Sequence, residues 1–398
     1  MLLVALVLWF FITGIVIIAY AHRDMVDAWR EPVLRRPVVV IESDDWGAGP
    51  AGQAIALRDI EKVLASVSDA EGRHPVMTLG VILAAPDGRR SSDSHNYCRS
   101  VISMQTHADL LEVIKSGVDA GVFSVQLHGM EHFWPAALLA AADKNKSVHD
   151  WLQRAPDNFT EMLPSALQSR WIDASVLPSK PLSVDNIRHA VAEEVKAFTD
   201  VFGAKPAVVV PPTFIWNTDV ERAWADAGVD VIVTPGRHIE GRDTDGRPVL
   251  TGRPIYNSQA GAQSVVYMVR DVYFEPSLGH TARQVLIESE SRLRLKRPVL
   301  LETHRFNFIG PKSDPVKALK ELGCLLRGAV EKIPDVAFIS TEELACHLKR
   351  RSPEWVDQHL MQRLHVWIER LGMKSRMHKM VVMSGWIIPV WLLWKVSR

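Results

Sequence analysis

The sequence lacks an excess of charge of either sign. It holds 46 Lys and Arg against 46 Asp and Glu in 398 residues, so its formal net charge is zero. A neutral total removes bulk electrostatics as a reason to bind nucleic acid or other acidic polymers. We therefore expect no nucleic-acid partner, and partners must be sought in local features.

Cysteine and phosphate-binding loops are also scarce. Cys98, Cys324 and Cys346 are widely spaced and form no CxxC pair. Such a set argues against a disulfide framework and against a thiolate zinc site. No strand expected below is followed by GxGxxG or GxxxxGK[ST], so the sequence offers no nucleotide-binding loop.

Charged side chains are missing from residues 1–20, MLLVALVLWFFITGIVIIAY. A helix of this length reaches roughly 30 Å, the thickness of the hydrocarbon layer. We expect 1–21 to be an uncleaved transmembrane anchor; a cleaved signal peptide is the alternative, although no Lys or Arg precedes the apolar run. The first basic residues follow the run, which favours an inner or plasma membrane protein with a cytoplasmic domain. A periplasmic or extracellular domain is the alternative.

The other end of the chain is basic and then apolar. Residues 353–379 place Trp and Leu at helical spacing between basic residues, which predicts an amphipathic helix on an anionic membrane surface or against the domain. Residues 380–394 form a hydrophobic membrane segment that is short for a span and contains Pro389.

Short runs of β-branched residues recur through the middle of the chain, with helix-like stretches between most of them. We expect strands at 37–41, 76–83, 122–127, 207–210, 229–233, 264–269, 298–302 and 335–339. This alternation predicts an α/β fold, a distorted (β/α)7–8 barrel over 37–348, with an open doubly wound sheet as the runner-up. Residues 135–185 are too long and irregular for a crossover and are expected to be an insertion.

Three polar motifs follow strands one, three and seven of this series. They are Asp44-Asp45, the pair His128 and His132, and His304. Each alone has a plain structural explanation, as turn residues, coincidence or a packed histidine. Together, one carboxylate and two imidazoles make an open site for a divalent ion, and the remaining carboxylate and imidazole supply a base and an acid.

This constellation resembles the NodB-homology or polysaccharide deacetylase family, which includes carbohydrate esterase family 4. The resemblance implies that Asp44 is the catalytic base, that Asp45, His128 and His132 hold the metal, and that His304 is the catalytic acid. Gly129 stands where the family has Ser or Thr. The implied cofactor is a divalent ion, Zn²⁺ foremost, with Co²⁺, Ni²⁺ or Mn²⁺ as alternatives.

The sequence departs from the family pattern at two points. The family's Arg before a proline, which orients the base, is missing from Val208–Phe214, and Arg270 and Arg305 are the candidate substitutes. The family's acidic partner of the acid histidine is also absent from its usual segment, and Asp271 is our candidate for tuning His304.

The resemblance implies hydrolysis of an N-acyl group, foremost N-acetyl, from an amino sugar of a polysaccharide or lipid-linked glycan. Backbone N–H groups of Thr213 or Phe214 would stabilise the oxyanion, and tryptophans beside the motifs, including Trp134, are candidates for stacking on a sugar. The full set of expected substrate-binding residues is Trp46, Pro212, Thr213, Phe214, Trp216 and Leu301. Two alternatives are a glycoside hydrolase that uses Asp44 and Glu302, and a non-catalytic glycan-binding or assembly protein.

Overall fold

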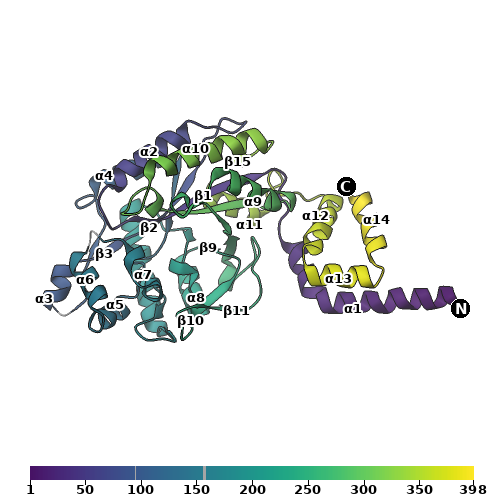
Figure 1. The fold of residues 1–398 in the computed structure, drawn as a ribbon, viewed down its shortest axis with the longest axis horizontal. Coiled ribbons are helices and arrows are strands. Elements are labelled where there is room, and N and C mark those ends of the chain that lie inside the picture. Colours follow the sequence, from purple (N-terminus) through teal and green to yellow (C-terminus); the bar gives the residue numbers. More distant parts are fainter. Residues whose placement is uncertain (95, 156–157) are drawn as a thin grey trace.

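The computed structural model, which describes residues 1–94, 96–155 and 158–398, contains a curled parallel sheet surrounded by helices (Figure 1). The strands follow the order β12-β9-β8-β5-β2-β1-β14-β13, and β15 pairs with β1. Their bounds are β1 Val38–Gly47, β2 Met77–Ile82, β5 Phe123–Leu127, β8 Val208–Val209, β9 Val231–Thr234, β12 Val266–Val269, β13 Val272–Tyr273, β14 Val299–His304 and β15 Ala337–Phe338.

The expected barrel is confirmed in distorted form. All eight expected strands are present, and every pair within the large sheet is parallel. No pairing joins β12 to β13 among the described residues, so the barrel stays open at this seam. The sequence prediction missed β13, which has only two residues, and three small antiparallel hairpins: β3 Ala84–Pro86 with β4 Arg99–Val101, β6 Ile172–Asp173 with β7 Lys180–Pro181, and β10 His238–Arg242 with β11 Pro248–Thr251.

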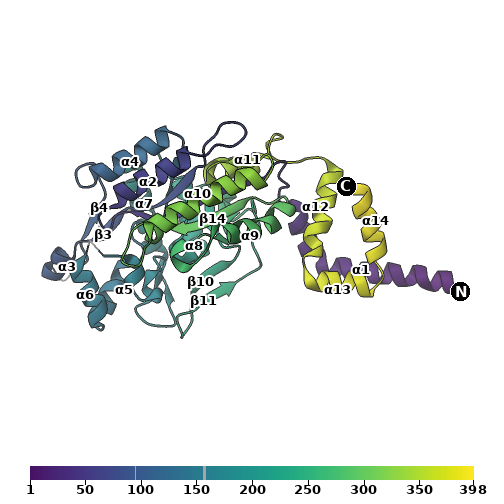
Figure 2. The same cartoon turned by 45° about the horizontal axis from the view of Figure 1, so that its top comes forward.

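Helices cover the outside of the sheet, as crossovers between parallel strands require (Figure 2). Their apolar faces pack on the strands; Leu57, Ile60 and Leu64 of one helix, for example, are fully buried. The bounds of these helices are α2 Gln53–Ala65, α4 Ala108–Asp119, α7 Val184–Phe202, α8 Thr218–Ala227, α9 Ala282–Arg294, α10 Pro315–Lys332 and α11 Thr341–Arg350. The short helix α3 Gly88–Ser94 lies away from the sheet, against α6 Lys146–Arg154 (Figure 2).

The expected insertion forms short helices and a hairpin of its own. Its residues 156–157 are not among those that the structure describes. It contains α5 Pro135–Ala142, α6 Lys146–Arg154, the 3-10 turns η1 Thr160–Met162 and η2 Ser165–Gln168, and the hairpin β6–β7. A separate apolar cluster around Leu138 and Trp151 holds its helices together. The turn η1 reaches the pocket described below.

Strand β1 is the centre of the sheet. All ten of its residues are buried, and it pairs with β2, β14 and β15. Its register with β14 places Asp44 directly beside His304. The register with β2 shifts between Ser43 and Trp46, which is a bulge at the carboxyl end of the strand. Bulges commonly redirect side chains next to active sites.

The apolar amino terminus forms the start of α1, a single helix over Leu2–Arg30 that projects from the barrel (Figure 1). This helix is long and apolar enough to cross a membrane, and only 6% of its most apolar 18-residue stretch is buried against the rest of the protein. The carboxyl-terminal helices α12 Leu360–Gly372, α13 Ser375–Met383 and α14 Ile387–Ser397 lie beside it.

The structure subdivides the two carboxyl-terminal segments differently from the sequence prediction. Helix α12 occupies only part of 353–379, and Trp355 lies before it, packed on the barrel core. Within 380–394 the chain bends by 113° between α13 and α14, so these residues form no straight span. The bend follows Ser384-Gly385, where Gly385 has a φ of +82°, while Pro389 sits in the first turn of α14.

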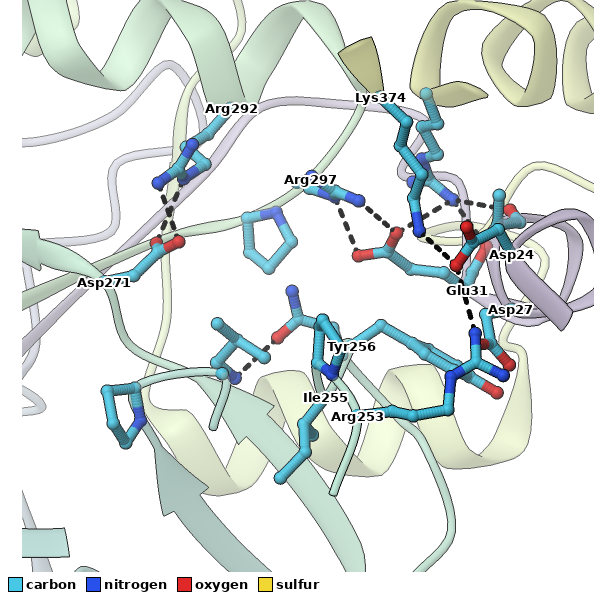
Figure 3. A pocket seen from close by; sticks show the side chains of 18 residues that line it. Asp24, Asp27, Glu31, Arg253, Ile255, Tyr256, Asp271, Arg292, Arg297 and Lys374 are labelled. Atoms are coloured by element: carbon cyan, nitrogen blue, oxygen red, sulfur yellow. Dashed lines mark hydrogen bonds and ion pairs between the residues drawn. The ribbon is translucent and has the colours of Figure 1, made fainter. Parts of the chain in front are cut away.

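Ion pairs join α1 and the carboxyl-terminal helices to the barrel (Figure 3). Arg297 binds Glu31 at 2.7 Å, and Arg253 contacts Asp27 at the same distance. The buried guanidinium of Arg370 donates to backbone carbonyls of Pro32 and Leu295, among others. These contacts tie α1 and α12 to the same side of the barrel.

Candidate metal centre and active site

The expected metal ligands meet at one point. The Oδ1 atom of Asp45 lies 3.5 Å from Nε2 of His128 and 3.5 Å from Nε2 of His132. One ligand atom from each residue lies within 4.8 Å of the others, and all three side chains are buried. The Nδ1 atom of His128 contacts the carbonyl oxygen of Val210 at 2.8 Å, which fixes the ring with Nε2 directed at Asp45.

The donor set fits a divalent cation. Among the described residues, Oδ1 of Asp45, Nε2 of His128 and Nδ1 of His132 have no hydrogen-bond partner. Burial alone would lower the pKa of His128, but Asp44 and Asp45 raise it, so this point favours positive charge. Burial lowers the pKa of His132 to about 4, which keeps that ring neutral as a ligand must be.

The backbone holds Asp45 in an unusual conformation. Its φ is +73°, in the left-handed region that non-glycine residues rarely adopt, at the bulge where the register of β1 and β2 shifts. Such conformations cluster at functional sites, where the surrounding structure maintains them. Gly129, which lies between His128 and His132 in the sequence, has a φ of +102°. Glycine adopts this conformation without strain, which explains why it suits this position.

Arg270, one of the two candidate substitutes for the missing motif arginine, lies beside the expected base. Its Nη2 atom is 2.6 Å from Oδ2 of Asp44, and the same guanidinium contacts Glu42 at 2.7 Å and Glu302 at 3.3 Å. Burial raises the pKa of the Asp44 carboxyl, but Arg270 holds it below its usual range. Arg305, the other candidate, instead lies 3.8 Å from Glu161.

A glycine makes room for the Asp44 carboxylate. A Cβ atom on Gly80 would lie 2.3 Å from Oδ1 of Asp44, closer than two such atoms can approach. Gly80 lies on β2, next to β1, so the side chain of Asp44 folds back across the neighbouring strand. Its Oδ1 atom has no hydrogen-bond partner among the described residues and is available to a ligand.

The expectation for Asp271 is wrong. Asp271 forms an ion pair with Arg292 at 2.7 Å, and Figure 3 shows this pair in a different pocket. The partner of His304 is Glu275, whose Oε1 atom lies 2.6 Å from Nδ1. Asp271 follows Arg270 directly after β12 and precedes β13. Glu275 comes after β13, which pairs with β14, so Glu275 and not Asp271 reaches His304 at the end of β14.

Glu275 sets the protonation of His304. Burial lowers the pKa of His304, but the hydrogen bond and charge of Glu275 outweigh it and raise the pKa to about 10. The ring is therefore protonated at neutral pH, with Nε2 on the side away from Glu275. Asn307 also binds Glu275, so this carboxylate is held from two sides.

The groups surround one pocket of about 340 Å³. Asp44, Asp45, His128, His132 and His304 all line it. The other lining residues are Thr160, Glu161, Gln168, Val210, Pro211, Thr213, Phe214, Arg270, Tyr273, Glu302 and Phe306.

Several expected substrate-binding residues lie elsewhere. Trp46 and Trp216 are fully buried, and their indole N–H groups donate to Ser43 and Glu221 inside the protein. Leu301 and Pro212 are buried and do not line the pocket, and Trp134 packs against the core. These aromatic rings fill the barrel because a bulky apolar side chain beside a strand end is stabilised most by burial. Thr213 and Phe214 do line the pocket, each with a φ of +55°.

Glu161 is a charged pocket residue that the sequence did not indicate. Glu161 comes from η1 of the insertion, and neither of its carboxylate oxygens has a hydrogen-bond partner among the described residues. Burial and the charge of Asp45 raise its pKa. No sequence motif marks Glu161, because only the fold of the insertion brings it over the metal ligands.

A network of ion pairs holds the segment that carries His128 and His132. Arg170 contacts Glu131 at 2.6 Å and Glu194 at 3.1 Å, and Arg99 contacts Glu131 at 2.7 Å. Glu194 also accepts a hydrogen bond from the N–H of Met130. The segment between His128 and His132 is therefore fixed from α7 and from the insertion.

Among known proteins, only solved structures proved similar to this chain. No protein-family model matches the chain, and no curated protein matches it. A family 4 carbohydrate esterase from Streptomyces lividans is 12% identical, with a TM-score of 0.36 over 78% of this chain and 95% of that one. A family 4 acetyl xylan esterase from Clostridium thermocellum, with cobalt bound, is 14% identical, with a TM-score of 0.36 over 77% of this chain and 89% of that one.

A family 4 pseudoenzyme from Bacillus anthracis is also similar. It is 12% identical, with a TM-score of 0.37 over 78% of this chain and 66% of that one. The two esterases and the pseudoenzyme are thus similar to this chain to the same degree. Whether the pocket is catalytic must therefore be argued from the residues of this chain.

Proposed function

We propose that the chain is a metal-dependent hydrolase that removes an N-acyl group, foremost N-acetyl, from an amino sugar of a polysaccharide or lipid-linked glycan. The observation that carries this proposal is the arrangement of one pocket. An open Asp-His-His donor set lines the same pocket as a carboxylate held by Arg270 and a protonated imidazole held by Glu275. Such a pocket contains the base, the acid and the electrophile that amide hydrolysis requires.

Asp45, His128 and His132 would hold the divalent ion, with Zn²⁺ the first candidate and Co²⁺, Ni²⁺ or Mn²⁺ as alternatives. When bound there, the ion supplies Lewis acidity toward the acyl carbonyl and a water molecule. Three protein ligands leave coordination positions open, as catalytic sites do.

Asp44 is the base in this proposal. Its pKa is below the usual range, so it is ionised at neutral pH and able to accept the proton of the attacking water. Arg270 orients the carboxylate by binding Oδ2 and leaves Oδ1 without a partner. In this proposal Arg270 takes the place of the missing motif arginine.

His304 is the acid. It is protonated at neutral pH, and its position beside Asp44 in the paired strands places acid and base on the same pocket. Transfer of the Nε2 proton to the departing nitrogen would release the amine. For the oxyanion, the N–H of Phe214 already donates to the carbonyl of Pro211 at 2.8 Å, so we assign this role to the N–H of Thr213.

The glycosidase alternative is disfavoured by the position of Arg270. A glycosidase needs a scissile bond between its two carboxyl groups. Asp44 and Glu302 both bind the same guanidinium, which occupies the space between them.

The test is acetate release from N-acetylated sugars by the full chain before and after treatment with EDTA. We expect activity to be lost on chelation and restored by zinc or cobalt. Asp44→Asn should lower kcat by about 10²- to 10⁴-fold, the usual contribution of a general base, while metal content stays unchanged. A fully active Asp44→Asn enzyme, or activity that survives complete metal removal, would refute the proposal.

A further inference from the structure

Two adjoining hollows lie where α1 meets the carboxyl-terminal helices, away from the catalytic pocket. The first is a half-open cavity of about 390 Å³ between α1, α12, α13 and α14, with an almost wholly apolar lining. Four tryptophans contribute to this lining: Trp367, Trp386, Trp391 and Trp394. A cavity of this kind favours a hydrocarbon chain over water.

The second hollow is a wider groove of about 1010 Å³, and its lining is basic. Five cationic side chains line it, against the single carboxylate of Asp24: Arg23, Arg237, Arg253, Lys374 and Arg376. Asp24 is shared by Lys374 at 2.7 Å and Arg253 at 3.0 Å. Among the described residues, Arg23, Arg237 and Arg376 contact no carboxylate, so the groove has positive charge to spare.

The amino-terminal end of α13 adds to this charge. Lys374, Ser375 and Arg376 line the groove at the first turn of the nine-residue helix, which has no acidic residue and no side-chain cap. The first N–H groups of a helix and its dipole favour an anion, and phosphate is a common one.

The two hollows adjoin, and one is apolar whereas the other is basic. Both are lined by Ile18 and Met377. Along α1 the apolar cavity is lined by residues from Gly14 to Met25, and the basic groove is lined by residues from Ile18 to Asp24, around the end of the charge-free run. A ligand with its tail in the cavity would therefore have its head at the level where the membrane surface lies if α1 spans the bilayer.

We infer that this paired site binds one membrane phospholipid with an anionic phosphate headgroup. The phosphate lies against Arg237, Arg376 and the start of α13, and an acyl chain fills the tryptophan-lined cavity. None of the residues that line the groove also lines the catalytic pocket, which favours a resident bilayer lipid over a lipid-linked substrate. The inference does not depend on the proposed hydrolase activity.

The experiment is native mass spectrometry of the full chain in detergent, titrated with phosphatidylglycerol, phosphatidylcholine or a polyprenyl phosphate. We expect a one-to-one complex with phosphatidylglycerol. The double variant Arg237→Gln, Arg376→Gln should weaken it by roughly tenfold or more, because each basic residue contributes about 1 kcal/mol to anionic-lipid binding. The matched control is Arg188→Gln, Arg283→Gln, which removes two exposed arginines from α7 and α9 and should change nothing.

A second variant tests the cavity separately. Gly372 lines the cavity, and a Cβ atom there would have no neighbour within 4 Å, so Gly372→Leu fits and occupies the space of the acyl chain. We expect this variant to lose the lipid while its thermal unfolding midpoint is unchanged or raised. Equal binding of phosphatidylcholine, tighter binding of the polyprenyl phosphate, or indifference to both variants would overturn the inference.

Discussion

At the scale of the residue, one guanidinium and one carboxylate determine how the proposed catalytic groups are charged. Arg270 contacts three buried carboxylates, and Glu275 holds His304. Burial raises the pKa values of Glu42 and Glu302, whereas the Asp44 carboxyl stays below its usual range because the charges of Arg270 and His128 outweigh its burial. Neighbours of this kind separate the protonation of acid and base within one pocket.

Replacing Arg270 tests how the base is positioned. In Arg270→Lys a single ammonium cannot contact three carboxylates in the fork geometry of a guanidinium. We expect kcat to fall by about tenfold or more, and the acidic limb of the kcat/KM profile to move to higher pH as the pKa of Asp44 rises. The metal content should remain that of the parent, and a variant with unchanged kinetics would mean that Asp44 needs no orientation by Arg270.

Replacing Glu275 tests the acid. The folded-state pKa of His304 is raised to about 10, so the proton is retained at neutral pH and is lost only as pH rises through that value. Glu275→Gln removes the charge that raises it, and the alkaline limb of kcat should move to lower pH. The same linkage adds stability that is fully present below about pH 6.5 and lost toward pH 10, so the variant should be less stable near neutral pH.

Asp271→Asn is the matched control for Glu275→Gln. Asp271 pairs with Arg292 outside the pocket, so its replacement should leave the pH profile in place. A shift of the alkaline limb in Asp271→Asn but not in Glu275→Gln would reverse the assignment.

At the scale of the element, the carboxyl ends of β1, β5 and β14 bring three separated motifs together. Parallel pairing makes this possible, since neighbouring strands end at the same edge of the sheet. The match is close because β1 and β14 pair in register up to Asp44 and His304, and because β1 bulges just beyond.

Gly80 of β2 is the element-level feature that can be tested. In Gly80→Ala the added methyl group would overlap Oδ1 of Asp44, so the carboxylate must move away from the pocket. We expect kcat to fall by about 10²-fold or more with metal still bound, because displacement of a base by about 1 Å has effects of this size. Gly72→Ala is the control: no atom lies within 4 Å of the added carbon, and because the φ of Gly72 is positive, the change should affect stability alone.

At the scale of the whole molecule, the barrel is joined to α1 by partly exposed ion pairs and by the buried side chain of Arg370, which favours a fixed rather than tethered arrangement. The side of the membrane on which the barrel lies is still a prediction. The arginines that follow the apolar run favour the cytoplasm.

A native cysteine can report the orientation. Cys324 on α10 is exposed, whereas Cys98 and Cys346 are partly buried. We expect a membrane-impermeant maleimide to label the chain in inverted vesicles and to leave it unlabelled in intact cells. Cys324→Ser should lose most of the labelling in vesicles, and strong labelling of Cys324 in intact cells would place the barrel outside.

Local sequence patterns are enough to predict the α/β class, eight of the nine strands of the large sheet and the strand ends that carry Asp44, Asp45, His128, His132 and His304. These follow from local patterns, since β-branched runs mark strands and short motifs mark their ends. The sequence by itself also determined the apolar run of α1, which depends on composition alone.

Only the tertiary structure decided which residues support those motifs. Arg270 and Glu275 reach Asp44 and His304 across more than 200 and nearly 30 residues of chain, and no local pattern encodes such contacts. The same holds for Trp46 and Trp216, which were expected at a sugar site and lie in the core, because burial depends on what packs around a side chain. Residue type and spacing specify the chemistry that is present, whereas the geometry of long-range packing specifies which groups meet.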